Sequence, residues 1–331
     1  MSMRLSLAGV RGIGNVNALP LFLVIGLLSY AGNQTPPAAP DRESEAFRIS
    51  MDVALVVLHA TVIDRQGGFV SDLAQRDFEV FEDGKPQQIR VFTNEDVPVT
   101  VGLVVDHSTS MQPKLKEVTA AARTFVKLSN PEDEMFVVNF NEHVTLGLPA
   151  KVRFTASVAQ LESAIAAAPA SGQTALYDAI AKALGELKAG SRDKKVLIVV
   201  SDGGDNASAL SRAQVMKLAD QSSAVIYTIG VFDADDADQN PGVLKHLAQV
   251  TGGEAFVTDQ ISEIGPISER IARDIRHQYT IGYEPANPSR DDASHTIRVH
   301  ASVKGREKLS VRTRTSYVAG GEPRLDAKGV K

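Results

Sequence analysis

Between Val99 and His277, a series of apolar runs alternates with segments of helical period, and this alternation limits the folds that the chain can adopt. The runs are VTVGLVVD, MFVVNF, KKVLIVVS, AVIYTIGVF and the short EAFV. Strands that are apolar on both faces are typical of a parallel sheet covered by helices on both sides. We therefore expect residues 97–277 to form an α/β domain with a doubly wound, mostly parallel sheet. Only two residues separate MFVVNF from HVTLGLP, so these two strands should pair antiparallel.

The segments between the strands carry apolar residues at helical spacing. The first, KLKEVTAAARTFVKLS, places Leu115, Val118, Ala122, Phe125 and Val126 on one face. Further helices are predicted in SVAQLESAIAAA, ALYDAIAKALGELKAG, SRAQVMKLADQS, GVLKHLAQVTG and ISEIGPISERIARDIRHQ.

Both flanks of this region alternate with period two, which indicates strands. In DFEVFEDGKPQQIRVF, two alternating runs meet at Asp83-Gly84, a strong hairpin pattern. Three more alternating runs follow His277. Each flank has too few strands to be stable alone. We therefore expect residues 49–95 and 278–318 to form one small β-sandwich, with the α/β domain inserted between its halves. Two separate β appendages are the alternative.

The N-terminus has the order of a secretory signal peptide. Arg4 and Arg11 precede the apolar run ALPLFLVIGLL, and the small residues of SYAG follow it. The run is short for a bilayer span, which needs about 20 residues. We expect residues 1–31 to be cleaved, leaving a secreted or periplasmic protein with no membrane span in the mature chain; an uncleaved anchor is the alternative.

The sequence around these domains has few further features. Residues 32–48 are rich in proline and polar side chains, as linkers are, and residues 319–331 are predicted to be a disordered tail. A chain without Cys has no disulfides and no thiolate metal site. A net charge of −5 gives no electrostatic reason to expect nucleic-acid binding. The phosphate loop and the G-x-S-x-G nucleophile motif are also missing from the sequence.

Oxygen-bearing side chains follow the predicted strands of the central sheet. Asp106, Ser108 and Ser110 come at the end of the first strand, Thr174 precedes a helix, and Asp202 ends the KKVLIVVS strand. Ligands bind at the carboxyl ends of such strands, so we expect these five side chains to converge there. A set of carboxylates and hydroxyls suits Mg²⁺ or Mn²⁺. The sequence therefore predicts one such ion at this edge, and no catalytic residue.

In these residues the chain resembles the von Willebrand factor A (VWA) domain family with its metal-ion-dependent adhesion site (MIDAS). The family's motif is D-x-S-x-S, then a distant Thr and a distant Asp, and SDG and GQTALYDAI match its context. The likeness covers Val99 to about His277 and implies a Rossmann-like fold. With its DFEVFEDGKPQ segment, the whole chain also resembles exported bacterial proteins that carry this domain.

The resemblance implies a role for each site residue. Ser108 and Ser110 would coordinate the ion directly, and Thr174 directly or through water. Asp106 and Asp202 would hold it through waters and hydrogen bonds to the hydroxyls. An Asp or Glu carboxylate of a protein partner would complete the coordination.

Two other functions fit the sequence less well. A metal-dependent hydrolase or phosphatase would need a general base, for which Asp205 and His107 are the candidates. A structural module would use the metal only to stiffen loops. The acidic segment from Asp233 to Asn240 is predicted to be a solvated loop; a Ca²⁺ site is the alternative, but the segment lacks the Gly and the distal Glu of a calcium loop.

Overall fold

The computed structural model describes residues 55–232, 239–285 and 293–319. The predicted signal peptide and linker therefore lie outside the described residues, as do nearly all of the predicted tail and most of the acidic segment. Among the residues that are described, no helix is long and apolar enough to cross a membrane.

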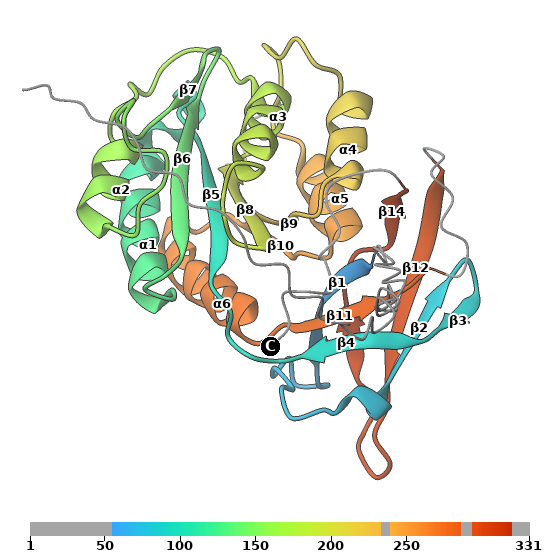
Figure 1. Cartoon of the computed structure of the whole chain (residues 1–331). Coiled ribbons are helices and arrows are strands. Elements are labelled where there is room, and N and C mark those ends of the chain that lie inside the picture. The colour runs from blue at the N-terminus through green and yellow to red at the C-terminus, as the bar shows by residue number, and fades with distance from the viewer. Residues whose placement is uncertain (1–54, 233–238, 286–292, 320–331) are drawn as a thin grey trace, which may run out of the picture. The chain divides into compact units, whose positions relative to one another are not determined.

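The centre of the described chain is a six-stranded sheet with the strand order β10-β9-β8-β5-β6-β7 (Figure 1). All neighbouring strands run parallel except the β6–β7 hairpin at one edge, as the short connection between MFVVNF and HVTLGLP predicts. The four strands β5, β6, β8 and β9 are almost entirely buried, which explains their uninterrupted apolar sequences. The strands are β5 (Val99–Asp106), β6 (Glu134–Phe140), β7 (Val144–Leu146), β8 (Lys194–Ser201), β9 (Val225–Val231) and β10 (Ala255–Thr258).

Helices cover both faces of this sheet. On one side α3, α4 and α5 pack in series; on the other, α1 lies between α2 and α6 (Figure 1). Each predicted helix is present, and Ser211 caps α4 as its position before the helix suggests. The helices are η2 (Thr109–Lys114), α1 (Leu115–Leu128), α2 (Val158–Ile165), α3 (Leu176–Leu187), α4 (Arg212–Gln221), α5 (Pro241–Thr251), η3 (Ile261–Glu263) and α6 (Ile264–Arg276).

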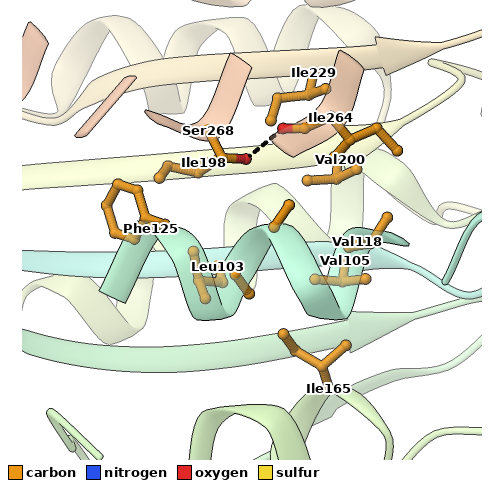
Figure 2. A pocket seen from close by; sticks show the side chains of 12 residues that line it. Leu103, Val105, Val118, Phe125, Ile165, Ile198, Val200, Ile229, Ile264 and Ser268 are labelled. Atoms are coloured by element: carbon orange, nitrogen blue, oxygen red, sulfur yellow. Dashed lines mark hydrogen bonds between the residues drawn. The ribbon is translucent and has the colours of Figure 1, made fainter. Parts of the chain in front are cut away.

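Helix α1 faces the sheet with the side predicted from its spacing. Val118, Ala122, Phe125 and Val126 are buried, and Leu115 is half-buried at the start of the helix. A small space remains between α1, α6 and the sheet, and its lining is apolar except for Ser268 (Figure 2). The Ser268 hydroxyl already donates a hydrogen bond to the Ile264 carbonyl at 2.8 Å, so this space offers little to orient a polar ligand.

The flanking strands form two four-stranded antiparallel sheets that share one hydrophobic core. Their orders are β13-β1-β11-β4 and β14-β12-β2-β3, so each sheet combines strands from both ends of the chain. The expected β-sandwich with an inserted α/β domain is thus confirmed. Its strands are β1 (Val56–Ile63), β2 (Phe78–Glu82), β3 (Lys85–Gln87), β4 (Ile89–Thr93), β11 (Tyr279–Tyr283), β12 (Ser294–Ala301), β13 (Ser310–Arg312) and β14 (Ser316–Val318).

Two runs that alternate continuously in sequence are each divided between the two sheets. KPQQIRVF gives β3, which pairs with β2, and β4, which pairs with β11. The last run gives β13, which pairs with β1, and β14, which pairs with β12. At the second crossing, the Arg314 guanidinium donates to the carbonyl oxygens of Asp220 and Ser222 at 2.8 and 3.0 Å. Contacts with the α/β domain therefore fix the point at which the chain passes from one sheet to the other. The sequence near Arg314 does not predict these contacts.

Asp83 and Gly84 form the two-residue turn between β2 and β3, as their sequence predicts. Both have positive φ angles, 49° and 76°. A turn with two residues in this region matches the twist of the strands that it joins, and Gly adopts it without strain.

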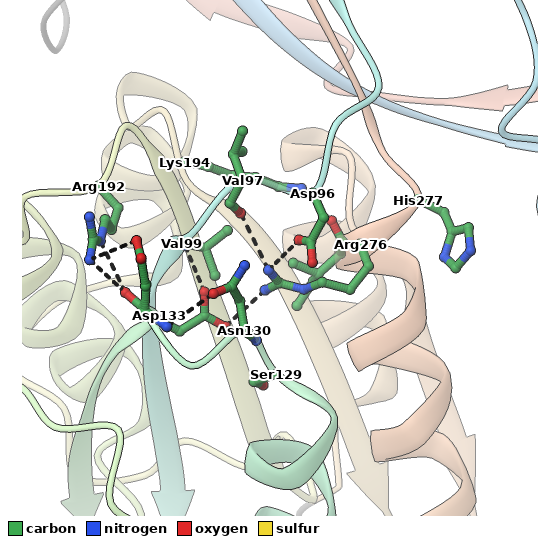
Figure 3. A network of polar contacts seen from close by, with 12 residues as sticks. Asp96, Val97, Val99, Ser129, Asn130, Asp133, Arg192, Lys194, Arg276 and His277 are labelled. Carbon is green, nitrogen blue, oxygen red and sulfur yellow. Dashed lines mark hydrogen bonds and ion pairs between the residues drawn. The ribbon is translucent and has the colours of Figure 1, made fainter.

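The two connections between the α/β domain and the sandwich lie side by side (Figure 3). Arg276, at the end of α6, donates to Asp96 at 2.7 Å and to Asp133 at 2.9 Å. Asp133 also accepts a bond from the Val99 amide at the start of β5, at 2.8 Å. Lys194 lies in the same region, where burial lowers the pKa of its amine to about 7.

The sandwich also contacts the α/β domain through Asp274 of α6, which is buried. Its carboxylate accepts a hydrogen bond from Thr61 of β1 at 2.6 Å and pairs with Arg312 of β13. Arg312 also pairs with Glu254. One carboxylate therefore contacts strands from both halves of the sandwich.

Candidate metal centre

Two adjacent parallel strands bring the predicted site residues to one edge of the sheet. Asp106 is the last residue of β5, and Asp202 directly follows β8. The strands are paired up to Val105 and Val200, so they end at nearly the same level. The loops that follow both strands therefore begin side by side.

A series of hydrogen bonds joins three of the predicted residues. The hydroxyls of Ser108 and Ser110 lie 3.2 Å apart, and the Ser110 hydroxyl donates to Asp202 at 2.5 Å. Ser108 and Asp202 are buried, whereas Ser110 is half-buried at the rim. The loop after β5 and the loop after β8 thus share one cluster of oxygen atoms.

Asp106 lies at the base of this cluster and is fully buried. Its carboxylate accepts bonds from the Ser108 amide at 2.8 Å and from the Ser201 hydroxyl at 2.6 Å. Burial raises the pKa of Asp106 to about 6, although its hydrogen bonds oppose this; the nearby charge of Asp202 contributes in the same direction as burial.

The third loop carries Thr174, whose backbone is bound to the loop after β8. Its amide donates to the Asn206 side chain at 2.9 Å, and its carbonyl accepts from the amides of Asn206 and Ala207 at 3.0 and 3.1 Å. This loop also contacts the first one, because the Gly172 carbonyl accepts from the Thr109 amide at 3.3 Å. The five predicted residues therefore lie at the end of β5 and in three loops that hydrogen-bond one another.

Sequence reasoning missed three residues that support the cluster. Ser201 holds the Asp106 carboxylate, and Asn206 holds Thr174. Glu142, which follows β6, accepts a bond from the Gln173 amide at 2.8 Å. Ser201 could have been found from its place at the end of β8 beside Asp106, but the other two depend on loop conformations that sequence patterns do not predict.

The two residues considered as general bases have other roles. His107 is 1% exposed and points into the interior, where its Nε2 lies 3.2 Å from the Asn139 side-chain oxygen. Asp205 accepts bonds from the Tyr177 amide at 3.2 Å and from the Ser208 hydroxyl at 2.5 Å, and so binds the first turn of α3.

The cluster has the chemistry of a site for a hard divalent cation. Its side-chain donors are carboxylate and hydroxyl oxygens, the ligands that Mg²⁺ and Mn²⁺ prefer. The hydrogen bonds that Asp106 and Asp202 accept come from hydroxyl and amide groups, which carry no charge. Two neighbouring buried carboxylates of this kind are stabilised by a cation between them. The residues therefore fit such an ion.

Comparison with protein families gives a match to the von Willebrand factor type A domain over residues 100–270. That range contains every residue of the cluster. No curated protein shows significant sequence similarity to the chain.

Several solved structures resemble the chain at low sequence identity. A von Willebrand factor type A protein from Catenulispora acidiphila is 13% identical, covering 80% of this chain and 73% of that one with a TM-score of 0.46. Proximal thread matrix protein 1 from the mussel byssus, with a zinc-occupied MIDAS motif, is 20% identical, covering 59% and 49% with a TM-score of 0.48. The vWF domain of a type V pilus tip protein from Porphyromonas gingivalis is 16% identical, covering 54% and 95% with a TM-score of 0.46.

Proposed function

The chain belongs to the von Willebrand factor type A domain family, and we propose that it is an exported protein that binds a protein partner through a divalent cation. The observation that carries this proposal is the difference in burial among the side chains of the oxygen cluster. Asp106 and Asp202 are buried, whereas Ser110, whose hydroxyl donates to Asp202, is half-buried at the rim. A cation held there would have the two carboxylates on its buried side and the half-buried Ser110 on the side that faces a partner.

The side chains divide the binding of the ion between them. Ser108, Ser110 and Thr174 would contribute neutral hydroxyl oxygens, and Asp106 and Asp202 would supply the negative charge, through water or through the hydroxyls. Because neutral ligands leave the cation with much of its positive charge, an Asp or Glu carboxylate of the partner can take a remaining position. The bound ion would supply the attraction for that carboxylate.

A metal-dependent hydrolase has less support. His107 faces Asn139 in the interior, and Asp205 is committed to the start of α3. Neither is therefore placed to act as a general base beside the cation. A purely structural metal remains the second candidate, and ligand binding separates it from the proposal.

Calorimetry with Mn²⁺ on residues 32–331 tests the site. We expect the unaltered chain to bind one Mn²⁺ with modest affinity at this edge, and Asp106→Ala and the isosteric Asp106→Asn to weaken binding at least tenfold. The matched control is Asp259→Ala, which removes an exposed carboxylate after the edge strand β10, with β9 between it and β8. Circular dichroism would check that each variant is folded. Equal binding by all four proteins would refute the site.

A second titration tests the proposed role of the ion. An excess of an acidic peptide should increase the affinity for Mn²⁺, and Mn²⁺ should increase the affinity for the peptide by the same factor, since linkage is reciprocal. A neutral peptide in which Gln and Asn replace Glu and Asp is the control. If the acidic peptide binds equally with and without EDTA, the ion has a structural role only.

Export is the remaining part of the proposal, and it is supported by the order of basic, apolar and small residues before Ala31. Mass spectrometry of the protein from the exported fraction should find a mature N-terminus near residue 32. Recovery of peptides that contain Leu21 from that fraction would favour the uncleaved anchor.

A further inference from the structure

A second group of ligand-type side chains lies in the β-sandwich, outside the sheet-edge cluster. Glu82 ends β2, Asp83 begins the tight turn, and His295 lies in the neighbouring strand β12. Each offers one ligand atom, and these atoms all lie within 4.8 Å of one another. Ligand atoms on one zinc ion lie about 3.4 Å apart, so the widest of these separations would have to shorten by up to about 1.4 Å.

Neighbouring contacts fix the orientation of Asp83 and His295. The imidazole Nδ1 lies 2.8 Å from one Asp83 carboxylate oxygen, and the Thr296 amide donates to the other at 2.9 Å. The ring also stacks on Tyr317, with centroids 5.1 Å apart and planes 24° from parallel. Both groups are thus held in place before any ligand binds, which reduces the entropic cost of binding.

Glu82 adds a buried carboxylate whose hydrogen-bond donors are uncharged. It is 5% exposed, and its Oε2 accepts bonds from the hydroxyls of Tyr283 at 2.6 Å and Tyr317 at 3.0 Å. A buried carboxylate is costly unless a positive charge accompanies it.

We propose that Glu82, Asp83 and His295 form a second divalent-cation site, one that selects Zn²⁺-type ions. An imidazole with carboxylates is a ligand set for zinc, whereas the all-oxygen cluster at the sheet edge favours Mg²⁺ or Mn²⁺. Three protein ligands leave a fourth position for water. Adjacent ligands of a tetrahedral zinc ion lie about 3.4 Å apart, so the 2.8 Å contact between Asp83 and His295 has only to open slightly.

Occupation of this site would connect the two halves of the sandwich. Asp83 and His295 are 212 residues apart in the chain, and the chain has no Cys with which to form a disulfide. A link that closes so long a loop removes much conformational freedom from the unfolded chain. The cation would therefore stabilise the fold in the way that a disulfide does, and could be removed by a chelator.

The test is a Zn²⁺ titration of residues 32–331 in excess Mg²⁺, which is added to compete with Zn²⁺ for the sheet-edge cluster; Zn²⁺ bound there would not respond to changes at Asp83 or His295. We expect one Zn²⁺ to bind and to raise the melting temperature by several degrees, reversibly with chelator. Asp83→Asn and His295→Gln should each weaken binding at least tenfold and abolish that rise. Asn tolerates the positive φ of residue 83, so the turn should be preserved in Asp83→Asn.

The matched control is His143→Gln, which alters an exposed histidine beyond β6. It should bind Zn²⁺ as the unaltered chain does. The proposal is overturned if the chain binds no Zn²⁺ under these conditions, or if Asp83→Asn and His295→Gln bind it as tightly as the control. Because Mg²⁺ is in excess and Asp106 is unchanged, failure here would leave the sheet-edge proposal untouched.

Discussion

The α/β domain and the β-sandwich each bury a separate hydrophobic core, but they assemble those cores from opposite kinds of connection. In the α/β domain, every strand except β6 is followed along the chain by a helix, and α5, for example, packs against β9 just before it. In the sandwich, buried hydrogen bonds join residues that are distant in sequence, such as Tyr283 and Glu82, which are 201 positions apart. The α/β domain therefore depends mainly on local sequence, whereas the sandwich requires both ends of the chain to be present.

Separating the two regions should change the fold most. Residues 97–277 alone should fold, because their core contains only their own side chains. Residues 45–95 alone should be unfolded, since β1, β2 and β4 lack the partners β11 and β12. NMR spectra of both fragments check this. A well-dispersed spectrum from residues 45–95 would show that the N-terminal strands do not need the C-terminal ones.

The next largest loss of stability is expected when a contact between the two regions is removed. Asp274→Ala removes a buried carboxylate that binds Thr61 and Arg312, and leaves a partly buried guanidinium with one partner fewer. We expect a loss of about 3 kcal/mol in the free energy of unfolding, and separate transitions for the two regions in urea. Asp259→Ala, on the exposed surface, should change stability by less than about 0.5 kcal/mol. A single unshifted transition in Asp274→Ala would mean that this contact does not couple the regions.

A smaller effect should appear in the pH dependence of stability. Burial lowers the pKa of Lys194 from 10.5 to about 7, so between these values the unfolded chain binds more protons than the folded chain. The free energy of unfolding should therefore rise with pH above about 7, by about 1–2 kcal/mol over two pH units. The groups facing the amine are Arg276, Asp274, Asp96 and Asp133.

The variant Lys194→Met tests whether Lys194 causes this rise of the free energy of unfolding with pH. It keeps an apolar side chain in the buried position and removes the titrating amine, so unfolding curves between about pH 7 and 9 should become nearly independent of pH. Lys188→Met provides the control on the same domain. An unchanged slope in Lys194→Met would place its origin in another group.

The smallest effect concerns the turn of the sandwich. Gly84 has a φ of 76°, and a Cβ there would meet no atom within 4 Å. Gly84→Ala should therefore cost about 1 kcal/mol through backbone strain alone. Gly185→Ala, in α3 and also without a steric contact, should instead leave stability unchanged or increase it. Thermal unfolding of both variants checks the difference; equal effects would contradict the strain argument.

The sequence was most informative where structure is local. Uninterrupted apolar runs predicted β5, β8 and β9, and the Asp83-Gly84 pair predicted the turn, because in both cases neighbouring residues determine the conformation. The division of KPQQIRVF between two sheets was not predictable in this way. Period-two alternation shows that a segment is extended, but not which sheet receives each half.

The site residues show the same limit. The convergence of Asp106, Ser108, Ser110 and Asp202 could be predicted, because parallel strands end at a common edge. The support of Thr174 by Asn206 could not, since it depends on the path of two loops. The group formed by Glu82, Asp83 and His295 also escaped prediction, because it requires β2 and β12 to be neighbours.

The position of β5 in the sheet has a mechanical consequence. This strand runs from the paired connections near Asp96 directly to Asp106, with β6 on one side and β8 on the other. Tension between a partner at the sheet edge and the sandwich would act along the strand axis. Its hydrogen bonds to both neighbours would then be loaded together, in shear, instead of breaking one after another from an end. The strand that ends in Asp106 would thus also carry part of a pulling force, and α6, which adjoins the second connection, would carry the rest.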